Sequence, residues 1–145
     1  MGKADLLRYV IRSFAAAIAV IFFLRFFVLD IYKIEGKSME PFLKQGRVIL
    51  VNKAAYGIRI PYKDIYLFRW AKPEKNDIVV FEEPENGLLS VKRCIQSTLG
   101  KKAVLPLGGG VTLAPYTMYV IGDNYAYSLD SRTFGPLPLD SLVGR

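Results

Sequence analysis

The sequence of 145 residues contains no histidine and only one cysteine, Cys94. The lack of histidine excludes a Ser-His-Asp triad and removes a principal ligand of zinc and other transition-metal sites. A single cysteine cannot form an internal disulfide, so we expect Cys94 to be a small core residue. The composition therefore predicts neither a metal nor a cofactor, and any hydrolytic chemistry must use a different base.

Charge is also scarce near the N-terminus, where Arg12 and Arg25 are the only charged residues from position 10 to position 29. Twenty helical residues span about 30 Å, enough to cross the hydrocarbon core of a bilayer. The apolar side chains outweigh the cost of about 3 kcal/mol for a central arginine, and Arg25 can extend toward the headgroups. No small-x-small cleavage site follows, so we interpret this segment as an uncleaved membrane anchor and not as a removable secretory signal.

The net charge of +7 favours an anionic partner, either lipid headgroups or nucleic acid. Between Tyr56 and Pro73, aromatic residues alternate with basic ones. Behind a membrane anchor this composition suits the lipid interface, so we expect a lipid bilayer and no nucleic acid as a partner. A plain strand with solvated charges explains the stretch equally well. The aromatic residues in question are Tyr62, Tyr66, Phe68 and Trp70.

From Asp30 onward, the hydrophobic pattern changes from helical to strand-like. Short β-rich runs alternate with turn residues, and no amphipathic helix longer than about two turns stands out after the anchor. The fold class predicted is therefore mainly β, with one compact domain following a single N-terminal transmembrane helix. The predicted strands are residues 31–34, 47–52, 77–81, 88–95, 103–105 and 118–121.

Ser38 lies in a tight polar turn that follows the first predicted strand. A serine hydroxyl is a poor nucleophile at neutral pH, and it needs a nearby base and donors for the oxyanion that forms. Without histidine, a lysine is the best remaining candidate, and Lys92 lies in an alternating apolar run. Burial there would disfavour the charged amine and lower its pKa. The alternative is that Ser38 is an ordinary turn residue.

Four segments of the chain, taken in order, resemble the conserved boxes of the type I signal peptidases. The resemblance extends from the apolar segment nearly to the last residue. It implies a signal-peptidase-like β domain and a serine endopeptidase that removes signal peptides from exported preproteins. The segments are Ser38-Met39-Glu40-Pro41, Asp77 to Phe81, Lys92-Arg93, and Gly122-Asp123-Asn124 with Ser128 to Gly135.

The resemblance also implies roles for individual residues. Ser38 matches the nucleophile, Lys92 the base, and Ser128 the hydroxyl that hydrogen-bonds the lysine amine. Part of the family has an oxyanion-hole hydroxyl where this chain has Gly36, so the backbone N–H of Ser38 must contribute more. Met39 can line the substrate cleft, although ordinary loop packing explains it as well. Structural ion pairs are implied for Arg93, Asp123, Asp130 and Arg132.

The implied organisation has three parts. Residues 1–9 form a short cytoplasmic tail, residues 10–29 the transmembrane anchor, and residues 30–145 the extracytoplasmic catalytic β domain. The resemblance places that domain on the outer face of a bacterial cytoplasmic membrane, because the lysines and arginines flanking the anchor do not decide its orientation.

The chain departs from the family pattern at residues 94–100, where a Gly-Leu-Pro-Gly-Asp turn is usual, and at Tyr125, where arginine is usual. Asn76 replaces a glycine, and asparagine tolerates the left-handed conformation. These departures leave open a catalytically impaired, membrane-tethered β module of the same family. A Ser-Lys self-cleaving regulator of similar fold is a further alternative, but the anchor occupies the place of its DNA-binding segment.

Overall fold

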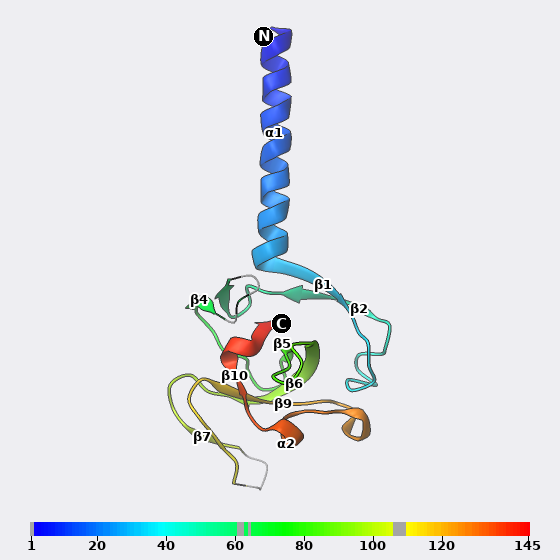
Figure 1. Cartoon of the computed structure of the whole chain (residues 1–145), viewed down its shortest axis with the longest axis vertical. Helices are drawn as coiled ribbons and strands as arrows, with labels where there is room; N and C mark the ends of the chain where they lie inside the picture. The colour runs from blue at the N-terminus through cyan, green and yellow to red at the C-terminus, as the bar shows by residue number, and fades with distance from the viewer. Residues whose placement is uncertain (1, 61–62, 64, 106–109) are drawn as a thin grey trace.

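The computed structural model describes residues 2–60, 63, 65–105 and 110–145. One long N-terminal helix leads into a domain built mostly of antiparallel strands (Figure 1). The predicted fold class, a mainly β domain after a single apolar helix, is confirmed.

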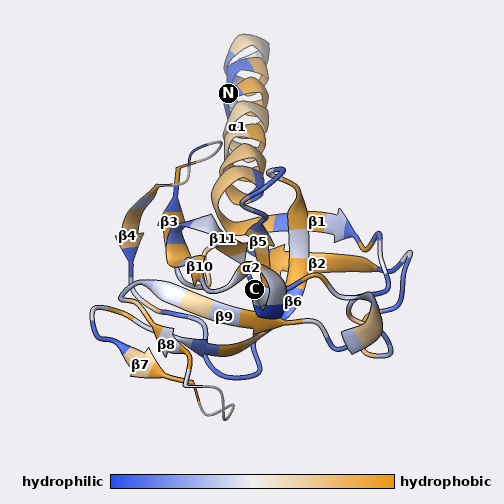
Figure 2. Ribbon diagram, turned by 60° about the horizontal axis from the view of Figure 1, so that its bottom comes forward, coloured by the Kyte–Doolittle hydropathy of each residue, from blue (hydrophilic) through white to orange (hydrophobic). Residues whose placement is uncertain are grey.

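Helix α1 (Lys3–Phe23) continues into a π-helical segment, η1 (Leu24–Val28). The helix therefore begins seven residues before the charge-poor segment that starts at Val10. From Ala4 to Val28 it is long and apolar enough to cross a membrane, by length and composition alone. Its residues are exposed as far as Arg25, whereas residues 26–28 are half-buried against the domain. The apolar residues are visible along the helix in Figure 2.

The central sheet has five antiparallel strands in the order β10-β9-β6-β5-β11. Three two-stranded sheets surround it in the described chain, pairing β1 with β2, β3 with β4, and β7 with β8. The strands are β1 (Leu29–Lys33), β2 (Val48–Asn52), β3 (Gly57–Arg59), β4 (Tyr66–Arg69), β5 (Ile78–Glu82), β6 (Leu89–Ser97), β7 (Ala103–Val104), β8 (Thr112–Leu113), β9 (Thr117–Ile121), β10 (Leu137–Pro138) and β11 (Leu142–Gly144). The short helices are η2 (Tyr125–Tyr127), α2 (Ser131–Phe134) and η3 (Leu139–Ser141).

The main core lies against the central sheet. Val79, Phe81 and Cys94 are fully buried there, as are Met118 and Val120 from β9. The prediction for Cys94 is confirmed, and burial raises the pKa of its thiol to about 12, which keeps it protonated. This core holds β5 and β6 rigidly together, and β6 carries the candidate base.

The end of the long helix is fastened to the domain through Asp30. Its carboxylate accepts a hydrogen bond from Arg25, accepts another from the Tyr32 hydroxyl at 3.0 Å, and lies 3.6 Å from Lys53 Nζ. The backbone N–H of Lys53 also donates to the carbonyl of Val28 at 2.7 Å. The Arg25 side chain is therefore directed toward the domain. From the sequence alone, we expected that it could extend toward the lipid headgroups.

Candidate active site

Ser38 lies in the loop between β1 and β2, as predicted, and the neighbouring Met39 fixes that loop. The Met39 side chain is 1% exposed and packs with Ile34 and Leu43 in a small apolar cluster. The Leu43 N–H donates to the Met39 carbonyl at 2.8 Å, which closes a turn immediately after Ser38. Met39 also lines the cleft that contains Ser38. Its position therefore agrees with both roles considered for it, loop packing and lining of the substrate cleft.

Lys92 approaches Ser38 from the middle of β6, where it is paired with Val79. Its amine donates a hydrogen bond of 3.0 Å to Ser38 Oγ, although the two residues are 54 positions apart. The lysine is only 4% exposed, and burial lowers the pKa of its amine, while the nearby charges of Glu83 and Asp130 oppose the change. The net shift is downward, which is what a lysine base needs in order to be neutral.

The turn at Gly122 lies directly against the Ser38 loop. The backbone N–H of Asn124 donates to the Ser38 carbonyl at 2.9 Å. A Cβ added to Gly122 would lie 2.6 Å from that same carbonyl oxygen and 2.1 Å from Ser128 Oγ. Glycine is therefore required here by close approach, since real Cβ atoms do not come so near to other atoms.

Ser128 donates its hydroxyl hydrogen to Asp130 Oδ2 at 2.7 Å. The expected bond between Ser128 and the Lys92 amine is not among the hydrogen bonds of the described residues, so the orienting role of Ser128 stays a prediction. The buried Asp130 carboxylate also accepts from the Gly122 N–H and from the Arg132 guanidinium. Burial alone raises the pKa of Asp130, but these hydrogen bonds outweigh it and lower the pKa to about 2. Asp130 therefore stays ionised and holds the Gly122 turn in place.

A second ion pair joins β6 to the same turn. Arg93 donates to both carboxylate oxygens of Asp123, at 2.8 and 2.7 Å. It also donates to the carbonyl of Asn76 at 3.1 Å, and Asn76 adopts a positive φ of 76°, the left-handed conformation expected for it. The guanidinium lies 5.1 Å from the ring centre of Phe42 in the Ser38 loop. The structure thus pairs the four charged residues as Arg93 with Asp123 and Arg132 with Asp130.

Tyr125, the departure from the family pattern in this turn, has a defined contact. The Arg132 guanidinium lies 4.2 Å above the centre of the Tyr125 ring, and Arg132 also donates to the Tyr125 carbonyl at 3.4 Å. The substitution therefore adds a stacking partner to the Arg132–Asp130 pair.

The cleft that contains Ser38 has a volume of about 550 Å³. One wall comes from residues 32–36 and the other from residues 87–91 at the start of β6. Buried apolar side chains on these walls include Ile34 and Met39, with Val91 partly buried. A cleft with apolar side chains beside a serine hydroxyl can hold an extended peptide with small side chains.

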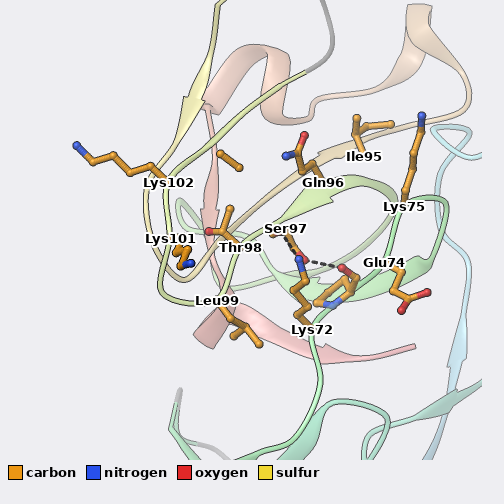
Figure 3. A pocket seen from close by; sticks show the side chains of 12 residues that line it. Lys72, Glu74, Lys75, Ile95, Gln96, Ser97, Thr98, Leu99, Lys101 and Lys102 are labelled. Atoms are coloured by element: carbon orange, nitrogen blue, oxygen red, sulfur yellow. Dashed lines mark hydrogen bonds between the residues drawn. The ribbon is translucent and has the colours of Figure 1, made fainter.

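A second hollow, of about 560 Å³, lies around the far end of β6 and contains neither Ser38 nor Lys92 (Figure 3). Lysines surround it, and Lys72 donates to the carbonyl of Ser97 at 2.9 Å. Figure 3 shows Lys75 and Lys102 pointing in different directions, so they do not converge on one ligand. Within the described residues, no group of three His, Cys, Asp or Glu side chains could hold a metal ion.

Glu83 is the functional candidate that the sequence did not reveal. It lines the Ser38 cleft and is the first of the two acidic groups that raise the pKa of Lys92. Arg93, the residue after Lys92, does not face this amine alone, because Asp123 engages its guanidinium. Alternation on β6 predicts that Ser90 and Lys92 share a face, but the position of Glu83 depends on the turn that follows β5.

Comparison with known proteins gives a family. The model for signal peptidase, peptidase S26, matches residues 7–98 and 96–145. The chain belongs to this family. Family membership confirms the resemblance found in the sequence, and it confirms the enzyme class as a serine endopeptidase.

Three relatives from the signal peptidase family show how the length of this chain compares with theirs. It is 32% identical to signal peptidase I of Bacillus caldolyticus, over 89% of this chain and 83% of that protein. Signal peptidase I V of Bacillus subtilis is 30% identical, over 78% of this chain and 80% of that protein. Signal peptidase I of Pseudomonas aeruginosa is 35% identical over 99% of this chain, which spans only 44% of that relative.

Proposed function

We propose that this chain is a membrane-anchored serine endopeptidase that removes signal peptides from exported preproteins, with Ser38 as nucleophile and Lys92 as general base. The observation that carries the proposal is the 3.0 Å hydrogen bond between Ser38 Oγ and the buried amine of Lys92. It supports a catalytic chain over an impaired β module, because nucleophile and base are already within proton-transfer distance.

The mechanism is acyl transfer. The neutral Lys92 amine takes the Ser38 proton while Oγ attacks the scissile carbonyl carbon, and the backbone N–H of Ser38 stabilises the oxyanion. The tetrahedral intermediate then expels the amine of the mature protein, which receives the proton held by Lys92. Lys92 next deprotonates a water molecule, which attacks the ester carbonyl. The second tetrahedral intermediate expels Ser38 Oγ, which takes the proton back from Lys92, and the signal peptide leaves with a new carboxyl group.

The apolar cleft accounts for the expected substrate preference. We assign it to the residues before the cut, because its walls begin next to Ser38 and include Ile34 and Val91. Space between two strand-like walls suits an extended chain with small side chains, as in the small-x-small pattern.

The pH dependence of preprotein cleavage tests this function. Burial lowers the pKa of Lys92, so the group that must be neutral loses its proton below the ordinary lysine pKa of about 10.4. We expect kcat/KM of the full chain in detergent to rise with pH and to reach half its maximum below that value. A midpoint at the ordinary lysine pKa, or a flat profile, would contradict the role of Lys92. Absence of a cut after a small-x-small site would contradict the function itself.

We further propose that α1 and η1 anchor the chain in the bacterial cytoplasmic membrane, with residues 1–9 inside and residues 30–145 on the outer face. Figure 1 shows β1, β2 and β4 as the strands nearest to the end of the helix. Strand β4 and the residue after it expose Phe68, at 70%, and Trp70, at 57%. Aromatic side chains in this position can enter the headgroup region.

Tyr66 does not belong to this exposed group. Its hydroxyl donates to the carbonyl of Leu142 at 2.8 Å, and Arg69 lies 3.9 Å above its ring. It therefore joins β4 to the domain, and the plain structural alternative holds for this residue. Tyr62, also considered for the interface, lies outside the described residues.

Removal of residues 1–29 should leave a folded domain with weak lipid affinity, since the buried apolar residues of the described chain begin at Ile34. Alanine at Phe68 and Trp70 should reduce its binding to liposomes roughly tenfold, because both aromatic side chains lose apolar contact with the bilayer. Flotation measures the bound fraction. Alanine at Leu99 and Val104, exposed near β7 at the end of the domain away from α1, is the matched control. Equal flotation of the two variants would rule out the interfacial role.

A further inference from the structure

The wall of the Ser38 cleft contains a carboxylate with no assigned role, that of Glu83. The residue lies in the turn that joins β5 to β6, where its N–H donates to the Leu88 carbonyl at 2.8 Å. Its carbonyl accepts from the Gly87 N–H at 2.9 Å, so the backbone of Glu83 is fixed from both sides. The half-buried side chain lines the same cleft as Ser38.

Two neutral donors hold the Glu83 carboxylate in place. The Ser90 hydroxyl donates to Oε1, and the Asn86 amide donates to Oε2 at 2.9 Å. Within the described chain Glu83 forms no ion pair, whereas Glu82 next to it is paired with Arg59. The charge of Glu83 is therefore oriented by hydrogen bonds but is not neutralised by a direct contact.

The strand register places Ser90, which holds this carboxylate, relative to Lys92. Lys92 and Ser90 are separated by one residue on β6 and share a face of the sheet, so Ser90 lies about 7 Å from Lys92 along the strand. The charge of Glu83 acts on the pKa of Lys92, which agrees with this proximity. An extended substrate advances about 3.3 Å per residue, so the side chain facing Glu83 lies about two residues from the scissile bond.

The other charges on the cleft walls do not compensate Glu83. Lys33 and Glu35 are both exposed, and their charges are opposite. Lys92 is neutral when it acts as the base, so it does not compensate Glu83 in the reactive state either. An anion that is partly removed from water attracts a cation more strongly than an exposed one, because the local dielectric constant is lower than that of water.

We propose that Glu83 is a specificity-determining residue, which favours substrates with a lysine or arginine about two residues before the cut and disfavours those with an acidic residue there. This inference rests on the proposed function, since it takes the cleft to be the substrate site. The ammonium or guanidinium of the substrate would contact the outward side of the carboxylate, while Ser90 and Asn86 hold its position.

The test uses the full chain in detergent and a series of peptides with lysine, glutamine or glutamate at each of the four positions before the cut. The quantity compared is the ratio of kcat/KM for the lysine and glutamate peptides. That ratio cancels effects common to both peptides, including any change in the pKa of Lys92. At the position two residues before the cut, the middle residue of the small-x-small pattern, wild type should prefer lysine roughly tenfold.

Glu83→Gln should bring this ratio close to one while retaining an acceptor for Ser90, and Glu83→Lys should reverse the preference. Glu85→Gln is the matched control, because Glu85 is exposed and is not part of the cleft wall. A preference that is unchanged in both Glu83 variants overturns the role of Glu83. Failure of wild type to cleave any peptide or preprotein would instead count against the proposed function, so the two outcomes can be distinguished.

Discussion

Lys92→Met is expected to abolish preprotein cleavage, with a loss of roughly 10³-fold or more in kcat/KM, because the substitution removes the only base that contacts Ser38 Oγ among the described residues. Methionine has a similar length and suits a site that is 4% exposed. Removing a buried amine does not leave an unpaired charge, so the domain should keep its thermal stability. Ser38→Ala should have the same effect on cleavage, since both variants remove one member of the same pair.

Cleavage of a preprotein in detergent, with thermal unfolding measured on the same samples, checks this expectation. Lys75→Met is the matched control, because Lys75 is exposed and does not line the Ser38 cleft. Near-wild-type turnover in either active-site variant would show that the assignment of that residue is wrong. A variant that loses activity and folding together would be replaced by Lys92→Gln before any conclusion is drawn.

Gly122→Ala is expected to reduce kcat/KM roughly 100-fold, because small displacements of a nucleophile have effects of this size. The added Cβ would lie 2.1 Å from Ser128 Oγ and 2.6 Å from the Ser38 carbonyl oxygen. Either the Ser38 loop or the Gly122 turn must move. Movement of the loop displaces Ser38 from Lys92, and movement of the turn disturbs the hydrogen bond from Asn124 to the Ser38 carbonyl. Kinetics with a peptide substrate and the thermal unfolding midpoint measure the two consequences.

The double variant Gly122→Ala/Ser128→Gly separates the two clashes. It removes both contacts with residue 128, at Oγ and at Cβ, but leaves the contact with the Ser38 carbonyl. Activity should stay low in the double variant if displacement of the Ser38 backbone is the cause. Recovery to the level of Ser128→Gly alone would show that the backbone tolerates the methyl group.

The sequence contained enough information to pair Ser38 with Lys92, since the lack of histidine left lysine as the base and the family boxes located both residues. It also indicated the β domain, because β2, β5 and β6 have clear strand patterns. Strands of two or three residues, such as β8 and β10, are too short to show a period of two. Their existence depends on pairing with distant segments, which a local pattern does not record.

The residues that surround the Lys92 amine were harder to predict from the sequence than Lys92 itself. Ser90 to Ile95 contains no acid, yet Glu83 and Asp130 both act on the pKa of Lys92 across strands and turns. Ser128 likewise has a partner that the sequence analysis did not name for it, because its hydroxyl donates to the Asp130 carboxylate. These contacts arise from register and turn geometry, which the identity of neighbouring residues does not determine.

The attachment of the helix to the domain through Asp30 has a consequence for where a preprotein is cut. Arg25 and Lys53 hold the helix end at the start of β1, and the Ser38 loop follows β1 directly. In a chain anchored as proposed, the height of the serine above the bilayer is then a fixed property of the fold. The enzyme would then select signal peptides by the number of residues between the apolar stretch and the cleavage site.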